Sequence, residues 1–157
     1  MGKDKKKRKA NGGMLVNKRA GFDYALSDEL KAGMNLNGRQ TRAARDGHVQ
    51  LKGSYVTVRD SELWLNNASF SLRLNTRGGE EKAVDTSPIK LLATKKQILA
   101  LEQGKKEGMS IVPTKLITDG RFIKLVVALG KGKKKYDKRE TIKRRDIERE
   151  HQRMMRV

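Results

Sequence analysis

The sequence predicts a mainly β protein, a small antiparallel barrel with helices on its outside and a basic tail at each end. Several short segments alternate between apolar and polar residues, which is the period of half-buried strands. One longer segment has the apolar spacing and the capping residues of a helix. Several short strands combined with one well-marked helix are typical of a small barrel with outer helices.

The charge divides the chain into three parts. Of the net charge of +19 over 157 residues, residues 1–20 and residues 130–157 each carry +7, and the segment between them carries only +5. We expect a disordered basic arm (1–13), a folded domain (14–130) and a basic C-terminal tail (131–157). Charge of this size indicates a polyanionic partner and says little about the fold.

The first half of the domain predicts a strand, a helix and a hairpin. Residues 22–33 mix aromatic and charged residues and are expected to form a strand, and residues 38–45 a short helix. Residues 54–59 alternate strictly, and residues 62–65 follow them after the turn-forming pair Asp60-Ser61. This spacing predicts a β-hairpin.

The middle of the domain predicts a loop and then the best helix. Residues 75–87 are rich in Gly, Glu, Asp and Thr, which is typical of a loop. Residues 94–104 have a helical apolar stripe. Thr94 can cap this helix and Gln97 stands three residues later, which is the pattern of a capping box.

A second hairpin is expected next. Residues 109–118 read as a strand, but Pro113 lacks an N–H donor, so this strand is either at a sheet edge or carries a bulge. Asp119-Gly120 predicts a type I′ turn. Residues 121–129 then alternate as the returning strand.

The tail has too little apolar surface to fold alone. Residues 130–157 hold twelve Lys or Arg against five Asp or Glu. Asp137 can cap a helix with Glu140 at its third position. The Glu140–Arg144 pair adds only a few tenths of a kcal/mol, which does not hold an isolated helix in water. We expect a tail that is disordered when free and helical when RNA or a ribosome neutralises it.

Catalytic and membrane signals are weak. The chain has no cysteine, and its two histidines, His48 and His151, lie far apart in sequence. The string GKGKKK lacks the first glycine and the Ser/Thr of a phosphate-binding loop. We expect that the protein is not an enzyme and that it binds neither a metal ion nor a cofactor. No apolar run approaches the ~20 residues that span a bilayer, and no apolar stretch follows the charged N-terminus as in a secretory signal. A cytoplasmic monomer without a membrane partner is expected.

The basic residues favour RNA as the partner. Asn17, Lys18 and Arg19 stand where the arm meets the domain, and lysine and arginine there can meet phosphates. A second group of arginines is spaced by three and shares one side if its segment is helical: Arg39, Arg42 and Arg45.

The aromatic residues are few. Of the seven in the chain, Trp64 and Phe122 are expected in the core, which leaves Tyr24 and Tyr136 as stacking candidates. A base-stacking platform is therefore not expected. Recognition should use shape, phosphates and 2′-hydroxyls, which suits structured RNA.

Five strings together resemble one family. They are NKRAGFDY (17–24), KAGMNLNGRQTRAARDGHVQLKGSYV (31–56), KLLATKKQI (90–98), VPTKL (112–116) and LGKGKKKYDKRETIKRRD (129–146). In this order and at these spacings they resemble the SmpB family, the SsrA-binding proteins that partner transfer-messenger RNA (tmRNA) in bacteria. The resemblance covers about residues 14–157.

The resemblance implies a fold and a function. The fold would be a closed antiparallel β-barrel with oligonucleotide-binding-like character and flanking α-helices. The protein would bind the tRNA-like domain of tmRNA and deliver it to stalled ribosomes for trans-translation, with elongation factor Tu as an indirect partner. The tail would occupy the vacant mRNA channel near the decoding site of the small-subunit rRNA. From the residues alone, a ribosomal or ribosome-assembly protein that binds rRNA remains the alternative.

Residue types and resemblance together give two sets of candidate residues. The RNA-binding set is Asn17, Lys18, Arg19, Tyr24, Lys31, Gln40, Arg42, Arg45, Lys90, Leu91, Leu92 and Lys124. The ribosome-binding tail set is Lys131, Lys133, Lys134, Tyr136, Asp137, Lys138, Arg139, Ile147, Met154 and Met155.

Three positions depart from the pattern of the family. Lys31 stands where an acidic residue is usual, Gln40 replaces a glutamate, and an arginine-rich run before Lys90 is reduced to Ser87–Ile89. The loss of two carboxylates and the gain of one cation make this surface more positive. We expect stronger attraction for phosphates and less discrimination between RNAs.

Overall fold

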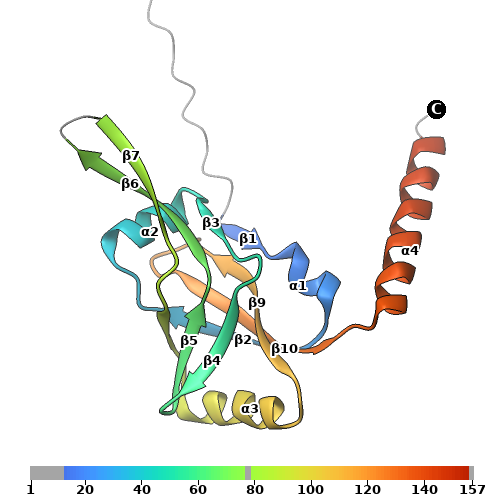
Figure 1. The fold of residues 1–157 in the computed structure, drawn as a ribbon, viewed down its shortest axis with the longest axis horizontal. Coiled ribbons are helices and arrows are strands. Elements are labelled where there is room, and N and C mark those ends of the chain that lie inside the picture. The colour runs from blue at the N-terminus through green and yellow to red at the C-terminus, as the bar shows by residue number, and fades with distance from the viewer. Residues whose placement is uncertain (1–12, 77–78, 156–157) are drawn as a thin grey trace, which may run out of the picture.

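The structure, a computed structural model, describes residues 13–76 and 79–155, so residues 1–12 of the expected disordered arm lie outside the described residues. Figure 1 shows the arrangement. The described elements are β1 (Met14–Val16), α1 (Lys18–Asp23), β2 (Tyr24–Met34), α2 (Gly38–Arg45), β3 (Val49–Gln50), β4 (Tyr55–Arg59), β5 (Glu62–Asn66), β6 (Ser69–Thr76), β7 (Gly79–Asp85), β8 (Ile89–Leu92), α3 (Lys95–Lys106), β9 (Ser110–Ile117), β10 (Lys124–Gly132) and α4 (Lys135–Met154).

Seven strands form one sheet that curls into a near-closed ring. Its order is β1-β9-β10-β2-β8-β5-β4, and every neighbouring pair is antiparallel. The last strand, β4, returns to β9 through the single pair Val56–Ile111. The mainly antiparallel architecture that the sequence predicts is confirmed, and the ring is weakest at this β4–β9 seam.

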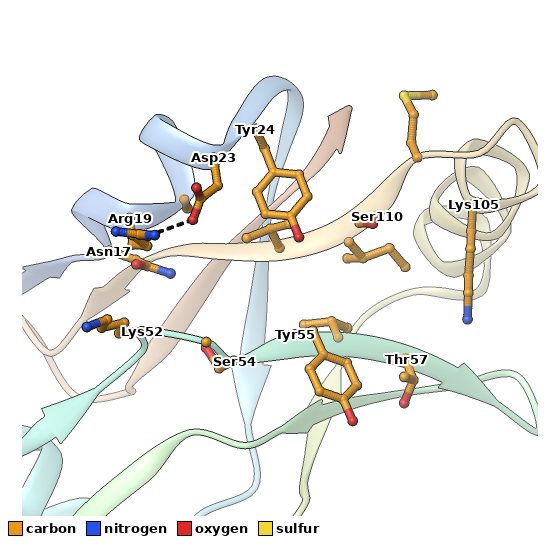
Figure 2. A pocket seen from close by; sticks show the side chains of 16 residues that line it. Asn17, Arg19, Asp23, Tyr24, Lys52, Ser54, Tyr55, Thr57, Lys105 and Ser110 are labelled. Carbon is orange, nitrogen blue, oxygen red and sulfur yellow. Dashed lines mark hydrogen bonds and ion pairs between the residues drawn. The ribbon is translucent and has the colours of Figure 1, made fainter. Parts of the chain in front are cut away.

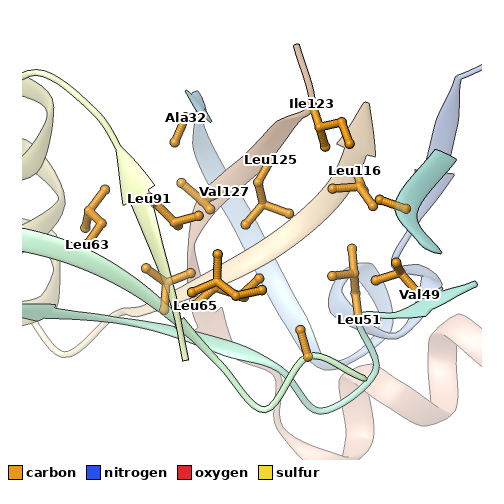
Figure 3. Close-up of a cluster of buried hydrophobic side chains, with 14 of the residues drawn as sticks. Ala32, Val49, Leu51, Leu63, Leu65, Leu91, Leu116, Ile123, Leu125 and Val127 are labelled. Carbon is orange, nitrogen blue, oxygen red and sulfur yellow. The ribbon is translucent and has the colours of Figure 1, made fainter. Parts of the chain in front are cut away.

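The core fills the inside of the ring. Side chains from β5, β8, β9 and β10 meet there, as Figure 3 shows. Alternation along each strand places one set of residues inward and leaves the next outward. The inward side chains that are least exposed include Leu63, Leu65, Leu116, Leu125 and Val127.

The prediction of a loop at residues 75–87 is wrong for residues 75–76 and 79–85, which are strand. Strands β6 and β7 pair from Phe70–Asp85 to Thr76–Gly79, and β3 joins them in a second, three-stranded sheet. The apolar face of β6, with Phe70 and Leu72 buried, anchors the hairpin. The amino-acid composition of β7 did not predict a strand, because its Gly, Glu and Asp residues have low strand propensity. Pairing with β6 outweighs that propensity.

The first hairpin and both predicted helices are confirmed. Strands β4 and β5 pair from Tyr55–Asn66 to Arg59–Glu62. Helix α2 has the bounds that its sequence predicts, and α3 runs two residues beyond the expected end. Thr94 Oγ1 accepts from the Gln97 N–H at 3.4 Å, and Gln97 Oε1 accepts from the Thr94 N–H at 3.0 Å, so the predicted capping box is present.

Pro113 lies at a bulge and not at an edge. Strand β9 has β10 on one side and β1 and β4 on the other. Pro113 pairs with Val127 while Lys115 pairs with Val126, so Thr114 is the extra residue. Its hydroxyl donates to the Val126 carbonyl at 3.2 Å.

The turn between β9 and β10 is wider than predicted. A type I′ turn needs positive φ at both central residues, but Gly120 has φ +86° and Asp119 is not among the residues with positive φ. The returning strand starts at Lys124 instead of residue 121. Phe122, which was expected in the core, is 68% exposed because it belongs to this loop.

The tail is helical in the chain by itself. Helix α4 begins at Lys135, and the Lys134 N–H donates to Asp137 Oδ2 at 3.1 Å. Asp137 therefore caps from inside the first turn and is not the first residue outside the helix. The prediction of a tail that is disordered when free is corrected for residues 135–154. Lys131, which was assigned to the tail, lies in β10 opposite Ala25.

Candidate nucleic-acid interface

The outer face of strands β8, β2 and β10 brings together three of the predicted residues. Lys124 pairs with Gly33, and Gly33 pairs with Leu92, while Lys31 pairs with Val126. Lys31, Leu92 and Lys124 are all exposed, because their neighbours Ala32, Leu91 and Leu125 take the inward positions. We call Lys31, Leu92 and Lys124 the sheet-face patch. Two lysines beside an exposed leucine can meet phosphates and the edge of a ribose.

The neighbouring positions of β8 have structural roles. Lys90 Nζ forms an ion pair with Glu62 of the adjacent strand, so its charge is already compensated. Leu91 is 2% exposed and packs inside the ring (Figure 3). The assignment of Leu91 to RNA contact is corrected, since RNA cannot reach a side chain at this depth.

Asn17 ties the chain together at the start of the domain. Its Nδ2 donates to the carbonyls of Leu51 at 3.1 Å and Pro113 at 2.9 Å, and its backbone N–H donates to the Thr114 carbonyl at 2.7 Å. The residue is 9% exposed. Both amide protons are thus used inside the protein, and Asn17 fixes the chain from which its exposed neighbours Lys18 and Arg19 project.

Helix α1 is joined to α4 by a cluster of charges around one carboxylate. Asp23 accepts from Arg19 Nε at 2.8 Å and pairs with Lys138 Nζ at 3.0 Å. The hydrogen bond from Lys138, with a smaller contribution from Arg19, holds the pKa of Asp23 below its usual value. We call Arg19, Phe22, Asp23, Lys138 and Arg145 the α1–α4 latch.

The ring of Phe22 completes this latch. The guanidinium of Arg19 lies 5.4 Å from the ring centroid, that of Arg145 5.8 Å and the ammonium of Lys138 6.0 Å. Lys133 adds a bond from its Nζ to the Gly21 carbonyl at 3.0 Å. Cations at such distances are attracted to the face of the ring. The first half of α4, as far as Arg145, is therefore held to α1, whereas its distal half extends away from the ring (Figure 1).

The remaining tail positions are exposed. Tyr136 and Arg139 lie on the surface of the first turn of α4, and Ile147, Met154 and Met155 lie further along it. Lys134 is exposed at the start of the helix. Within the tail set, Lys133 and Lys138 contact α1, Asp137 caps α4, and Lys131 belongs to β10. The other members of the set are exposed.

A hollow of about 480 Å³ lies at the β4–β9 seam (Figure 2). Arg19 and Tyr24 border it from the α1 side, and Lys52, Tyr55 and Lys105 from the other elements. Tyr24 lies against Gly130, where an added Cβ would come within 2.9 Å of the Tyr24 Cβ, so glycine is needed for this approach.

Sequence reasoning missed three residues of this hollow. Lys52, Tyr55 and Lys105 are exposed and come from the turn before β4, from β4 and from α3, respectively. Tyr55 occupies an outward position of a strand whose inward neighbour is the buried Val56. That alternation was the available signal for an exposed aromatic side chain.

Helix α2 separates the predicted residues Gln40, Arg42 and Arg45. Gln40 is buried, and its Nε2 donates to Asp85 Oδ2 at 2.8 Å, so its assignment to RNA contact is corrected. Arg45 donates to three carbonyls of the β9–β10 loop, of which that of Arg121 is nearest at 3.0 Å. Arg42 is exposed and remains a candidate.

No helix of the described residues is long and apolar enough to cross a membrane. Within residues 13–76 and 79–155, no group of three His, Cys, Asp or Glu side chains is placed to hold a metal ion.

Known proteins similar to this chain share one description. A family model described as SmpB protein matches residues 14–157. An SsrA-binding protein of Oenococcus oeni is 41% identical over 149 residues, which is 92% of this chain and 93% of that protein. An SsrA-binding protein of Coxiella burnetii is 39% identical over 156 residues, covering 99% and 98% of the two chains.

The fold is also similar to that of a chain in a solved structure. The structure is described as "tmRNA-SmpB: a journey to the center of the bacterial ribosome". The TM-score is 0.64 at 29% identity, and the match covers 83% of this chain and 95% of that chain.

Proposed function

The chain belongs to the SmpB family, whose model spans residues 14–157, and from this premise we propose that it is an SsrA-binding protein of trans-translation. It binds tmRNA and acts with it on the ribosome as a binding protein, not as an enzyme. The observation that carries this proposal is similarity along nearly the whole chain to SsrA-binding proteins, the tail included.

The tRNA-like domain of tmRNA is the proposed ligand of the sheet-face patch. Lys31 and Lys124 project from adjacent strands into solvent, and no ion pair joins either of them to a described acidic side chain. Structured RNA presents phosphates and 2′-hydroxyls to a surface of this kind. Lys18, at the start of α1, is exposed as well.

The tail is proposed to enter the vacant mRNA channel of a stalled ribosome, next to the small-subunit rRNA of the decoding site. Helix α4 has 20 residues, a length of roughly 30 Å at 1.5 Å per residue. None of its residues is buried, so its basic face stays available to rRNA. The latch holds the first half of the helix, as far as Arg145, and therefore sets the direction in which the helix leaves the domain.

The finer features of the family complete the proposal. The near-closed ring would act as a closed barrel of oligonucleotide-binding-like character, supported by the return of β4 to β9. The protein would work as a monomer in the cytoplasm, and elongation factor Tu would be an indirect partner through the RNA. The alternative hypothesis is that the chain binds only rRNA, as a ribosomal protein does. The binding experiment must exclude it.

Competitive binding tests the proposal. The full-length protein is titrated with the tRNA-like domain of tmRNA, bulk tRNA and 16S rRNA fragments at about 150 mM salt, since such affinities depend on salt. We expect a clear preference for the tRNA-like domain. Equal affinity for all three RNAs would contradict the proposal.

A matched pair of variants then locates the site. Lys31→Ala with Lys124→Ala should weaken binding. If each lysine neutralises one phosphate, the slope of the logarithm of the binding constant against the logarithm of the salt concentration should become less steep by about 1.8. The control, Lys95→Ala with Lys96→Ala, removes the same charge from exposed positions of α3. An equal loss of affinity in both double variants would show that the sheet-face patch is not part of the RNA-binding site.

The tail has a separate test. Asp137, Lys138 and Arg139 changed together to Ala should leave the affinity for the tRNA-like domain nearly unchanged, because the sheet-face patch is intact. Tagging of peptides on stalled ribosomes should be lost. Normal tagging by this variant would show that the tail does not act as proposed.

A further inference from the structure

Two cations face each other across the β6–β7 hairpin. Arg73 and Lys82 are a directly opposed pair in the antiparallel register, so their side chains project from the same face. Like charges directly opposite destabilise a sheet. Both residues are exposed, and no ion pair joins either of them to a described acidic side chain. Within the protein itself, this arrangement is unfavourable.

Helix α2 brings two more cations to the same place. Arg39 and Arg42 border a hollow of about 290 Å³ whose opposite wall contains Ser71 and Arg73. A second hollow of about 320 Å³ adjoins it and is bordered by Arg73 and Lys82. The single acidic residue among the lining of either hollow is Asp46. We call Arg39, Arg42, Arg73 and Lys82 the hairpin patch.

The two elements of the hairpin patch are fixed to each other. Gln40 Nε2 of α2 donates to Asp85 Oδ2 of β7 at 2.8 Å, and the Ser71 N–H donates to the His48 carbonyl at 2.9 Å. The Asp85 carboxylate also accepts from the hydroxyl of Ser87 at 2.6 Å. Asp85 is therefore used in joining the elements and is not a partner of the four cations.

We propose that the hairpin patch binds backbone phosphates of RNA and is a second RNA site of this protein. An anion placed beside Arg73 and Lys82 would relieve the repulsion between them, and a second one beside Arg73 would meet Arg39 and Arg42. Arginine presents a planar set of donors that binds phosphate oxygens in pairs, and three of the four residues are arginine. The hairpin of β6 and β7 projects from the ring (Figure 1).

The site is separate from the sheet-face patch. Arg73 and Lys82 belong to the three-stranded sheet β3-β6-β7, whereas Lys31 and Lys124 belong to the ring. That the ligand is RNA follows from the proposed function, and the phosphates can belong either to tmRNA or to small-subunit rRNA. The hairpin patch adds residues that neither the periodicity of the sequence nor the family strings single out: Arg73 and Lys82.

The experiment compares salt dependence in two arms. Arg73→Gln with Lys82→Gln is titrated against the tRNA-like domain of tmRNA in one arm and against purified small ribosomal subunits in the other, from about 50 to 200 mM salt. We expect the log–log slope to fall by about 1–2 in the arm that supplies the phosphates. The melting temperature should stay the same or rise, since the opposed like charges are gone.

Lys95→Gln with Lys96→Gln is the matched control, and its slopes should stay near those of the wild type. The proposal would be overturned if the salt slopes of the hairpin variant equalled those of the control in both arms. The hairpin patch would then bind a different partner, such as an acidic protein segment. The result is separable from a failure of the proposed function, which would appear in the wild type as equal affinity for the tRNA-like domain and bulk tRNA.

Discussion

Asp23→Asn tests whether a single carboxylate holds the tail helix against the domain. The carboxylate accepts from Arg19 and pairs with Lys138, and only the second contact joins α4 to α1. The side chain of Asp23 is 23% exposed and that of Lys138 34%. An ion pair at such a surface contributes roughly 0.2–1 kcal/mol. Its loss should shift the ratio of docked to undocked α4 by about 1.4- to 5-fold.

The latch keeps other contacts in this variant. The Lys133 N–H donates to the Asp23 backbone carbonyl at 2.9 Å, and the cations over Phe22 remain. We therefore expect a broader distribution of helix positions and an intact fold. Adding Phe22→Leu removes the ring as well and should broaden the distribution further.

Distances between two spin labels provide the assay. The chain has no cysteine, so Lys96→Cys on α3 and Glu150→Cys on α4 label two defined and exposed positions. Asp146→Asn is the control, because Asp146 pairs with Arg149 of its own helix at 3.7 Å and no ion pair joins it to the described residues of α1. Equal distance distributions for the wild type, Asp23→Asn and the control at low salt would refute the reasoning.

The dependence on pH gives an independent check. The pKa of Asp23 is lowered in the folded protein, chiefly by the hydrogen bond from Lys138. A lowered pKa means that the stabilisation is fully present above the unfolded value of about 3.9 and is lost as pH falls through the folded value. The wild type should therefore approach the Asp23→Asn distribution only in acid below that value.

The remaining predictions concern stability. Asn17→Ala removes one donor from each of the Leu51 and Pro113 carbonyls, of which that of Leu51 keeps the Ser54 N–H, and should lower the free energy of unfolding by about 1–3 kcal/mol, measured by urea denaturation. Gly104→Ala places a Cβ 2.4 Å from Leu129 Cδ1 and should lower the melting temperature, with a cost of about 1–3 kcal/mol for overpacking. A peptide of residues 130–157 should show little helix by circular dichroism in buffer, since isolated helices of this length are marginal.

Each of these predictions has a contrary outcome. Lys18→Ala is the control for Asn17→Ala because Lys18 is exposed, and equal stability of the two variants would contradict the structural role of Asn17. Gly38→Ala is the control for Gly104→Ala, since an added Cβ at Gly38 meets nothing within 4 Å. Strong helicity of the free peptide would show that α4 does not need the latch.

Local signals in the sequence predicted much of the fold. The alternation of residues 54–65 predicted the β4–β5 hairpin, and Thr94 with Gln97 predicted the start of α3, because strand period and helix capping depend on neighbours only a few residues away. The strings that resemble the family predicted the class of partner. Lys31 and Lys124 are exposed, and their contact with RNA stays a prediction.

The sequence could not assign the polar residues whose partners are distant. Asn17 and Gln40 look like surface residues, yet Asn17 bonds across 96 residues to Pro113 and Gln40 across 45 to Asp85. The β6–β7 hairpin was missed for the same reason, since β7 is a strand only because β6 lies beside it.

The sequence by itself determined the charge, the period of the strands and the family, each of which is carried by residue types and short spacings. Only the tertiary structure decided which cations stay free. Lys90 and Lys138 are paired with Glu62 and Asp23, whereas Arg73 and Lys82 are placed opposite each other. A charge acts on a partner only when no opposite charge of the protein lies beside it, and strand register and helix docking determine those neighbours.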